Sequence, residues 1–521
     1  MLIYAIAGLG VLVLVGWAGQ LTLGQWALVG VGAYASVRVA SANGSLVLAL
    51  LVGGGVAALI SVIVGLPALR VRGMFLGVAT MAFATFSQAW LFNRSFLSGV
   101  NSPTVYIPGA RLPMIGSVGE RGLYYITLII LILACGALQG LRRSGAALRI
   151  ASVRDNARKA AASGVPSSSV ALGAFALAGF LSGISGTLFA YSNQDFDITF
   201  FSPQVSFTLF ALVVIGGLSS IGGPILGAVV VIGIPLIFHF GLIAIFLGSG
   251  ALLLNVLLFA PDGLAGLWYW ARDWFVREVA RSLRTTALPS VRAQADSPLL
   301  SVEGIGVHFG GLVALDDVSL KVRPGEAVGV IGMNGAGKTT LLDCISGAVK
   351  PDKGKVLVKG VDVVPMAPAY RAYLGIGRTF QDGSVFRGLT VLESMLVSLE
   401  GGDYSGTLGG LTRAPWERWS QRRKEGMARR VLLDLGLSHR EEVLVGELST
   451  GERKLCDLAT ALVRQPELIV LDEPTAGLPH AEVEGVIEML KRLRQEYGSA
   501  LLLVEHDMNV VRAVTERAYV M

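Results

Sequence analysis

The residues with the clearest chemical meaning form a glycine-rich run, GMNGAGKT, at positions 332–339. The run fits the pattern G-x-x-x-x-G-K-[ST]. An apolar run typical of a buried strand precedes it, and a run typical of a helix start follows it. Glycines allow consecutive backbone N–H groups to point toward phosphate oxygens. The sequence therefore predicts a nucleotide phosphate site formed by Gly332, Asn334, Gly335, Ala336, Gly337, Lys338, Thr339 and Thr340.

Two acids follow a second apolar run, LIVLDEP, at positions 468–474. In proteins with such a phosphate loop, an acid at the end of this strand holds Mg²⁺, and we assign that role to Asp472. Thr339 is expected to offer Mg²⁺ a further oxygen ligand, and Lys338 to neutralise the β- and γ-phosphates. Glu473 points elsewhere and is expected to polarise the attacking water. ATP and Mg²⁺ are the expected cofactors, and ATP hydrolysis is the expected reaction.

These motifs lie in a chain that changes character along its length. Of its 521 residues, 53% are hydrophobic and 15% are charged, a charged fraction well below the quarter usual in soluble proteins. Long apolar runs fill the chain up to about residue 260, and an ordinary α/β pattern begins at about residue 301. The expected fold is a polytopic α-helical membrane domain followed by an α/β P-loop NTPase domain.

The apolar runs predict membrane-spanning helices, each of which needs about 20 mostly apolar residues. Arginines gather in the 142–167 loop and after the last run, and the positive-inside rule places both on the cytoplasmic side. This placement explains the net charge of +6 without a nucleic-acid partner, which we do not expect. Nine candidate spans lie near 2–18, 25–42, 46–66, 73–92, 122–141, 168–191, 205–221, 224–244 and 246–261.

The candidate spans contain almost no ionisable residues. Carriers driven by protons or sodium ions usually need carboxylates inside the membrane, so the energy is expected to come from outside these spans. The 142–167 loop is polar, rich in alanine and helical in character. It is either a solvated connector or a coupling helix that docks on the nucleotide-binding domain, and we favour docking because the same chain supplies a partner surface.

From residue 299 to 521 the chain resembles an ABC ATPase domain. RTFQ at 378–381 is similar to the Q-loop, LSTGER at 448–453 to the signature motif, and EHD at 505–507 to the switch-histidine segment. The resemblance implies that Gln381 contacts Mg²⁺ and the permease interface, and that His506 reaches the γ-phosphate. It also implies that Ser449 and Gly451 contact the γ-phosphate and that Phe309 stacks on adenine. Glu473, His506 and Gln381 are thus the expected catalytic residues, and Thr339, Gln381 and Asp472 the expected metal ligands.

A narrower resemblance covers nearly the whole chain. FGGLVALDDVSL, GIGRTFQ and VEHDMNVV are similar to the LivG-type ATPase of branched-chain amino acid importers. GWAGQLTLGQWALVGVGAY, SVRDNARKAAASGV and GGLSSIGGPILGA are similar to the LivM-type permease of those systems. The expected domains are a permease at 1–270, a linker at 271–298 and an ABC ATPase domain at 299–521. The ATPase domain is expected to be truncated at its C-terminus.

The resemblance implies one half of a transporter, because ABC ATPase sites are shared between two domains. The expected partners are a second permease and ATPase, LivH- and LivF-like or a second copy, together with an extracytoplasmic solute-binding protein and the lipid bilayer. The expected location is the bacterial inner membrane, with the ATPase domain in the cytoplasm. Alternatives are an importer of urea or short amides, an ABC exporter, and a membrane-anchored regulatory ATPase. The signature departs from the family at Thr450 and Glu452.

Overall fold

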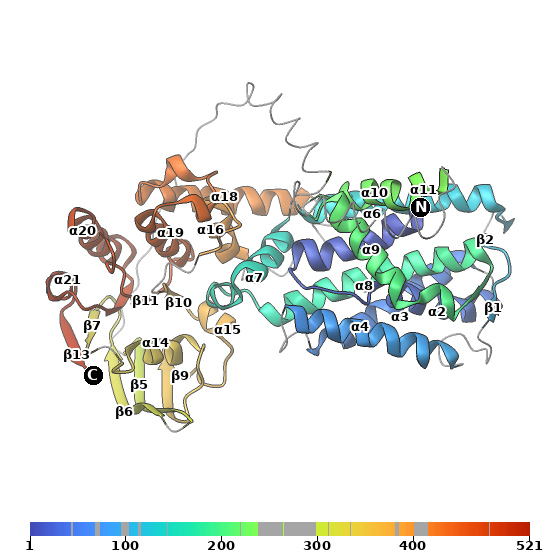
Figure 1. The fold of residues 1–521 in the computed structure, drawn as a ribbon. Coiled ribbons are helices and arrows are strands. Elements are labelled where there is room, and N and C mark those ends of the chain that lie inside the picture. The colour runs from blue at the N-terminus through green and yellow to red at the C-terminus, as the bar shows by residue number, and fades with distance from the viewer. Residues whose placement is uncertain are drawn as a thin grey trace. The chain divides into compact units, whose positions relative to one another are not determined.

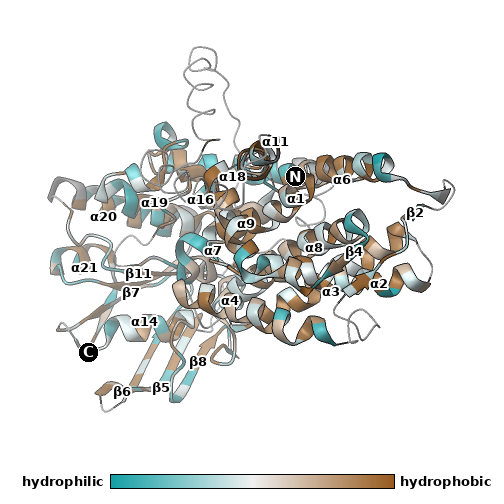
Figure 2. Ribbon diagram, turned by 45° about the vertical axis from the view of Figure 1, so that its right-hand side comes forward, coloured by the Kyte–Doolittle hydropathy of each residue, from teal (hydrophilic) through white to brown (hydrophobic). Residues whose placement is uncertain are grey.

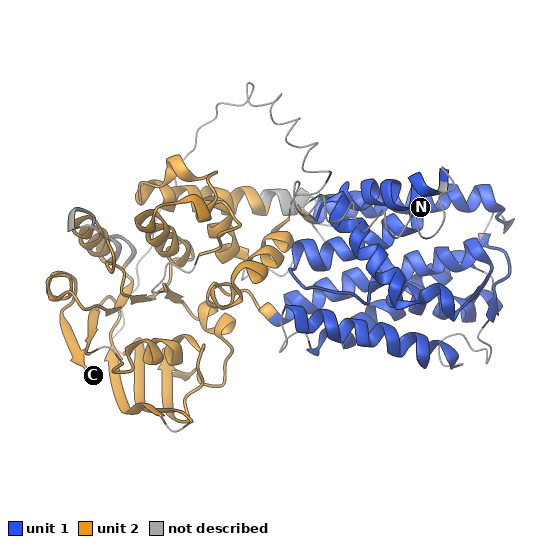
Figure 3. Cartoon of the chain, in the orientation of Figure 1, with its two compact units in different colours: residues 1–141, 168–282 blue, residues 142–167, 283–521 orange. Residues whose placement is uncertain are grey.

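The computed structural model divides into two compact units. The helical unit comprises residues 1–141 and 168–282, and the sheet unit comprises residues 142–167 and 283–521 (Figure 3). The 142–167 segment therefore clusters with residues far along the chain. The residues that the structure describes are 1–42, 45–67, 73–94, 104–112, 116–142, 144–218, 220–237, 264, 298–310, 312–333, 335–380, 385–400, 415–478 and 480–521.

Apolar helices make up most of the helical unit, and hydrophobic residues, drawn in brown, recur along them (Figure 2). Eight of the nine expected spans overlap helical segments, the eighth as far as Ile237, while 238–244 and the ninth span, 246–261, lie outside the described residues. Short helices η3 (Leu91–Asn93) and η4 (Ile198–Phe201) and short strand pairs join them. The helices are α1 (Leu2–Val11) with η1 (Leu12–Trp17), α2 (Gln25–Ala42), α3 (Leu46–Gly65), α4 (Met74–Ala89), α6 (Glu120–Arg142), α8 (Ser167–Asn193), α9 (Pro203–Gly216), α10 (Gly223–Ala228), η5 (Val229–Gly233) and α11 (Ile234–Ile237).

Within the described residues, four helices are long and apolar enough to cross a membrane, at 46–65, 74–93, 120–142 and 167–193. The last of these, α8, is the most buried of the four, because 67% of its most apolar stretch is buried against at most 33% for the other three. Small residues permit this burial. A Cβ atom at Gly186 would lie 1.9 Å from the Val29 carbonyl oxygen, so α8 and α2 touch backbone to backbone.

The sheet unit contains two sheets (Figure 1). One is parallel, in the order β10-β11-β12-β7-β13, and the other is antiparallel, in the order β6-β5-β8-β9. The parallel strands are β7 (Ala327–Ile331), β10 (Ile376–Arg378), β11 (Leu468–Asp472), β12 (Ala500–Val504) and β13 (Arg517–Val520). The antiparallel strands are β5 (Leu300–Phe309), β6 (Leu312–Val322), β8 (Lys353–Val358) and β9 (Val361–Asp362).

Alternation along the central strands builds a core on each face of the parallel sheet. Along β11, Leu468 and Val470 join one hydrophobic cluster, while Ile469 and Leu471 join the other. Successive side chains of a strand point to opposite faces, so a strand buried on both faces is apolar throughout. The α-helices described in this unit are α7 (Gly145–Ala162), α14 (Lys338–Ser346), α15 (Pro368–Tyr373), α16 (Val391–Glu400), α18 (Pro415–Asp434), α19 (Thr450–Leu462), α20 (His480–Tyr497) and α21 (Met508–Val514).

Candidate functional site

The glycine-rich run forms a tight loop between β7 and α14, as the sequence predicts. Gly335 and Gly337 have φ values of 85° and 88°, which side-chain-bearing residues rarely adopt. A Cβ atom at Gly337 would also lie 2.4 Å from the Ala314 carbonyl oxygen. Helix α14 begins directly at Lys338, whose Nζ donates hydrogen bonds of 2.8 Å to the carbonyl oxygens of Gly332 and Met333. The loop thus presents its backbone at a helix N-terminus, which suits a phosphate group.

Asp472 ends β11 and is 2% exposed. Burial raises the pKa of its carboxyl group to about 6; Glu473 and Asp343 raise it too, while Arg378 and a hydrogen bond from Thr339 lower it. Its Oδ1 atom has no hydrogen-bond partner among the described residues. A buried carboxylate oxygen without a partner, next to a threonine hydroxyl, is a suitable ligand set for Mg²⁺. Thr339 and Asp472, two of the three metal ligands predicted from the sequence, therefore lie together.

Glu473 and His506 also lie together. His506 Nε2 is 2.9 Å from Glu473 Oε1, and the imidazole is more exposed than the carboxylate. Glu473 has a φ of 49°, a conformation that non-glycine residues seldom adopt outside sites that require it. This turn directs the carboxylate of Glu473 toward His506 rather than along the strand. The two residues predicted to act on water and on the γ-phosphate thus form one pair.

Two further residues hold that pair in place. Glu505 is 3% exposed, and its Oε1 accepts hydrogen bonds from the Thr475 N–H at 2.9 Å and hydroxyl at 2.5 Å. Its Oε2 accepts from the His506 N–H at 2.9 Å. Lys454 Nζ donates to the Glu473 carbonyl oxygen at 3.0 Å and to that of Ala476. These contacts tie the turn after β11 to the turn after β12, so Glu473 and His506 keep their relative positions.

The signature residues stand at the N-terminus of α19. Ser449 is the N-cap, and its hydroxyl oxygen accepts a hydrogen bond from the Glu452 N–H at 3.2 Å. Glu452 Oε2 accepts in return from the Ser449 N–H at 2.9 Å, and Arg440 binds the same carboxylate. This reciprocal pair is a capping box, a motif in which glutamate is favoured three residues after the cap. The glutamate that departs from the family signature therefore has a local structural role.

The remaining predicted residues are placed as follows. Phe309 ends β5 with 52% of its surface exposed, so its ring is open to a stacking partner. Ala336, Thr340 and Gly451 stand in the phosphate loop, in α14 and in the first turn of α19. Gln381 and Asn334 lie outside the described residues. Asp472, Glu473, Ser449 and Gly451 line one cavity of about 630 Å³, which no described residue of the phosphate loop lines.

Helix α7 packs on α16 and α15 in the sheet unit. At its first residue, a Cβ atom on Gly145 would lie 1.9 Å from the carboxyl carbon of Glu400. Glu400 is fully buried, and its Oε1 accepts hydrogen bonds from Gln421 at 2.8 Å and Lys424 at 2.7 Å. A helix N-terminus carries a partial positive charge, so a buried carboxylate stabilises it there. Position 145 therefore requires the absence of a side chain.

Cationic and polar groups hold the other end of the 142–167 segment. Arg464 donates to the Ser163 carbonyl oxygen at 3.0 Å, and the Tyr373 hydroxyl donates to that of Gly164 at 2.6 Å. Between the two ends α7 is kinked at Asn156, which has φ −153° and ψ 93°. The Asn156 Oδ1 atom accepts from the Lys159 N–H at 3.0 Å and so caps the second half. This segment packs against the sheet unit through both of its halves.

Three buried residues that join α7 to the rest of the sheet unit carry little signal in the sequence. Lys159 of α7 and Asp457 of α19 form an ion pair in which each side chain is 2% exposed, and Arg378 lies beside it. In the sequence, Lys159 is one of several basic residues of the 142–167 loop, and Arg378 is only a neighbour of Gln381. The available signal was weak, because an aspartate in the middle of an otherwise amphipathic helix is usually exposed.

Comparisons with known proteins agree with this architecture. A family model described as ABC transporter matches residues 315–476, and one described as branched-chain amino acid transport system / permease component matches residues 1–259. The high-affinity branched-chain amino acid transport ATP-binding protein LivG of Escherichia coli is 37% identical over 223 residues, which are 43% of this chain and 88% of that protein.

Two further matches concern the same part of the chain. The probable branched-chain amino acid transport ATP-binding protein LivG of Methanocaldococcus jannaschii is 33% identical over 225 residues, which are 43% of this chain and 86% of that protein. The crystal structure of the ADP conformation of an ATP-binding cassette of an ABC transporter is 33% identical, covering 43% of this chain and 88% of that one with a TM-score of 0.38. The chain therefore belongs to the branched-chain amino acid ABC transporter family, with a permease part and an ATP-binding part in one polypeptide.

Proposed function

We propose that this chain is one half of an importer that uses ATP hydrolysis to move branched-chain amino acids across the bacterial inner membrane. The relatives whose names specify branched-chain amino acid transport support this substrate class. The observation that carries the proposal is the packing of α7, a segment between two apolar helices of the permease part, on the unit that holds the phosphate loop. Such packing couples the nucleotide site to the membrane helices.

Each residue of the nucleotide site has a role in this proposal. Lys338 and the backbone N–H groups of its loop bind the β- and γ-phosphates. Thr339 and Asp472 hold Mg²⁺, which when bound neutralises charge that develops on the phosphates. Glu473 orients the attacking water, and His506 holds the carboxylate of Glu473 and reaches toward the γ-phosphate. Phe309 stacks on the adenine ring.

The site is completed by a second ATP-binding domain. In this proposal Ser449 and Gly451, at the N-terminus of α19, serve a nucleotide bound to the partner domain. The partners are a second permease and ATP-binding subunit of the same kinds, or a second copy of this chain. A solute-binding protein delivers the amino acid outside the membrane. When ATP closes the two ATP-binding domains on each other, α7 transmits the movement to α6 and α8, between which it lies in the chain.

Replacement of Glu473 by glutamine tests the catalytic assignment. In the assembled transporter, E473Q should still bind ATP but lose at least about a hundredfold of its steady-state ATPase rate, because a general base contributes that much. E467Q, an exposed glutamate just before β11, is the matched control and should keep the full rate. Normal ATPase activity in E473Q would refute the role of Glu473.

A transport measurement tests the substrate class. Proteoliposomes that contain the co-purified complex and its solute-binding protein should accumulate radiolabelled leucine when ATP is supplied on the side of the ATP-binding domains. Excess isoleucine and valine should compete with the label, while excess urea should not. Competition by urea, without competition by isoleucine or valine, would identify a short amide as the substrate instead of an amino acid. ATP hydrolysis without any solute flux would instead favour a regulatory ATPase anchored in the membrane.

A further inference from the structure

A row of buried charges runs through the sheet unit from α7 to the proposed metal ligand. Its members are Lys159, Asp457, Arg378 and Asp472, and the side chain of each is 2% exposed. Removal of an ion from water costs several kcal/mol, which a close partner only partly offsets. Burial of four such groups in succession is therefore energetically unfavourable. None of the three links between them takes part in the ATP hydrolysis described above.

The first link joins α7 to α19. Lys159 Nζ donates to Asp457 Oδ1, lies 3.4 Å from the Arg378 carbonyl oxygen, and stands 5.5 Å from the centroid of the Phe380 ring. Lys159 belongs to the short second half of α7, whose start is capped by Asn156. The three contacts of the Lys159 ammonium group reach α19 and the end of β10. Both of these elements therefore fix the position of this half of α7.

The second link joins α19 to the end of β10. Asp457 Oδ2 accepts a hydrogen bond of 2.9 Å from the Phe380 N–H. The Arg378 guanidinium lies 4.8 Å from the centroid of the Phe380 ring, within the range of a cation–π contact, as does the Lys159 ammonium. The ring of Phe380 is thus held by two cations, and its backbone is held by the carboxylate that pairs with one of them.

The third link reaches the nucleotide site. One guanidinium nitrogen of Arg378 is 2.7 Å from Asp343 Oδ1, and the other is 3.9 Å from Asp472 Oδ2. Asp343 belongs to α14, the helix that begins at Lys338. Arg378 therefore faces both the helix that follows the phosphate loop and the proposed Mg²⁺ ligand.

Removal of Lys159 would leave the Asp457 carboxylate buried without its cation. The nearest other cation in this row is Arg378, which already contacts the same phenyl ring. Attraction toward Asp457 would draw the guanidinium away from Asp343 and Asp472, because an unpaired buried charge is more costly than a weakened contact. By pairing with Asp457, Lys159 thus keeps the Arg378 guanidinium group next to Asp343 and Asp472.

We propose that Lys159 and Asp457 are positioning residues through which docked α7 places Arg378, and thereby Asp472, for Mg²⁺–ATP binding and turnover. This inference rests on the proposed transport function, because it assigns the coupling of α7 to one ion pair. Neither residue touches the nucleotide in this proposal. The pair acts on the metal ligand through the Phe380 backbone and the guanidinium group of Arg378.

The test uses the assembled transporter with its solute-binding protein, as K159M, D457N, the K159M/D457N double variant and K159R. R158M is the matched control, since Arg158 is the exposed cation next to Lys159 in α7. Two quantities are measured: the solute-stimulated ATPase rate, and the Mg²⁺ concentration that half-saturates binding of a fluorescent ATP analogue. The second quantity reports on the metal ligands without any hydrolysis.

K159M should lose about tenfold of the stimulated rate and need several times more Mg²⁺ for nucleotide binding, a size within the range of coupling networks. D457N should also lose stimulated rate, because the Lys159 ammonium is then buried without its carboxylate and repels the neighbouring Arg378 guanidinium group. The double variant should recover toward the wild type, because both charges are removed while the asparagine oxygen can still accept from the Phe380 N–H. K159R keeps the charge and should retain most of the rate, and R158M should match the wild type.

Three results would overturn the proposal. One is a K159M variant with the rate and Mg²⁺ requirement of R158M. A second is a double variant whose loss equals the product of the two single losses. In the third, K159M fails to assemble and the added D457N substitution does not restore assembly. The pair would then serve folding alone. A wild-type complex without solute-stimulated ATPase would instead refute the proposed transport function, which separates the two failures.

Discussion

At the residue scale, the phosphate loop depends on backbone conformations that only glycine adopts easily. Gly337 combines a φ of 88° with a close approach to the Ala314 carbonyl oxygen. Because the next residue, Lys338, opens α14, any shift of Gly337 moves the N–H groups that face the phosphates. The steric requirement at this one position is thus directly linked to nucleotide binding.

We therefore predict that G337A weakens ATP binding by more than about tenfold, because a left-handed backbone costs about 1–2 kcal/mol for alanine before the clash with Ala314 is counted. The check is titration of the assembled protein with a fluorescent ATP analogue. G426A is the control: Gly426 lies within α18, and a Cβ atom there would meet nothing within 4 Å. G426A should bind ATP normally and gain up to about 1 kcal/mol of stability. Equal affinity in both variants would contradict the prediction.

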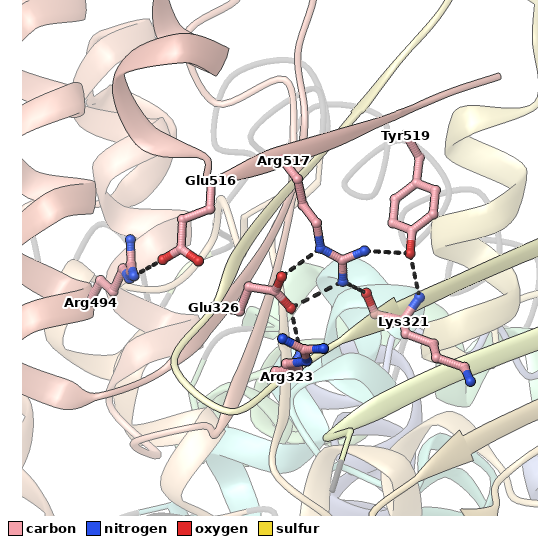
Figure 4. Close-up of polar contacts among 7 residues, drawn as sticks. All are labelled: Lys321, Arg323, Glu326, Arg494, Glu516, Arg517 and Tyr519. Carbon is pink, nitrogen blue, oxygen red and sulfur yellow. Dashed lines mark hydrogen bonds and ion pairs between the residues drawn. The ribbon is translucent and has the colours of Figure 1, made fainter. Parts of the chain in front are cut away.

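At the element scale, polar contacts hold the edge strand β13 to its sheet. Among the described strands it pairs with β7 alone, and Figure 4 shows the polar groups that hold it. Arg517 Nε is 2.5 Å from Glu326 Oε1, and the same guanidinium group donates to the Tyr519 hydroxyl and the Lys321 carbonyl oxygen. The Tyr519 hydroxyl also accepts from the Lys321 N–H at 3.1 Å. These contacts tie β13 to the segment that joins β6 to β7.

The Glu326–Arg517 pair makes the attachment of β13 sensitive to acid. The hydrogen bond from Arg517 lowers the pKa of Glu326 from its ordinary value of 4.5. A carboxyl group with a lowered pKa stabilises the folded state above pH 4.5 and loses that contribution as the pH falls through the lowered value. Because the Arg517 side chain is 41% exposed, the contribution is about 1 kcal/mol at most.

E326Q should therefore lower the protection of the β13 amides against hydrogen exchange at pH 7. It should also abolish most of the further loss of protection that the wild type shows below pH 4.5. The measurement is hydrogen–deuterium exchange of the amides of residues 517–520 in the full chain, corrected for intrinsic exchange rates. E484Q, at an exposed position of α20, is the control and should leave both values unchanged. An acid-induced loss of protection that is the same in E326Q and the wild type would refute this role of Glu326.

At the scale of the whole molecule, the two units depend on different kinds of packing. The sheet unit has an apolar core on each face of its parallel sheet. The helical unit instead brings helix backbones together at small residues, for example where Gly186 of α8 meets Val29 of α2. A bilayer supplies little hydrophobic drive for helix association, so close van der Waals packing carries more of the stability there.

G186V should accordingly destabilise the helical unit by about 1–3 kcal/mol, the usual cost of an overpacked contact, and leave ATP binding intact. Thermal unfolding of the detergent-solubilised chain, followed together with binding of a fluorescent ATP analogue, separates the two effects. G173A lies on the same helix at a position where a Cβ atom would meet nothing within 4 Å, and it should unfold like the wild type. Loss of ATP binding in parallel with the lower unfolding temperature would contradict the prediction.

Much of this architecture is predictable from local sequence. The phosphate loop, the strand that ends at Asp472 and helices at eight of the nine expected spans appear where the pattern of residues places them, and four of the described helices are long and apolar enough to cross a membrane. Such features depend on conformations and periodicities of neighbouring residues, which a sequence displays directly. The ninth span, the 271–297 part of the expected linker and Gln381 lie outside the described residues and stay predictions.

The sequence alone thus determined which residues stand in the candidate nucleotide site and the division into apolar and α/β parts, because both follow from residue types over short stretches. Only the tertiary structure decided which groups meet across long stretches of chain. The kink at Asn156, the need for glycine at position 145 and the pairing of Lys159 with Asp457, 298 residues away, all depend on how α7 packs. A buried charge is stable only beside its partner, and no local pattern specifies a partner that packing alone brings near.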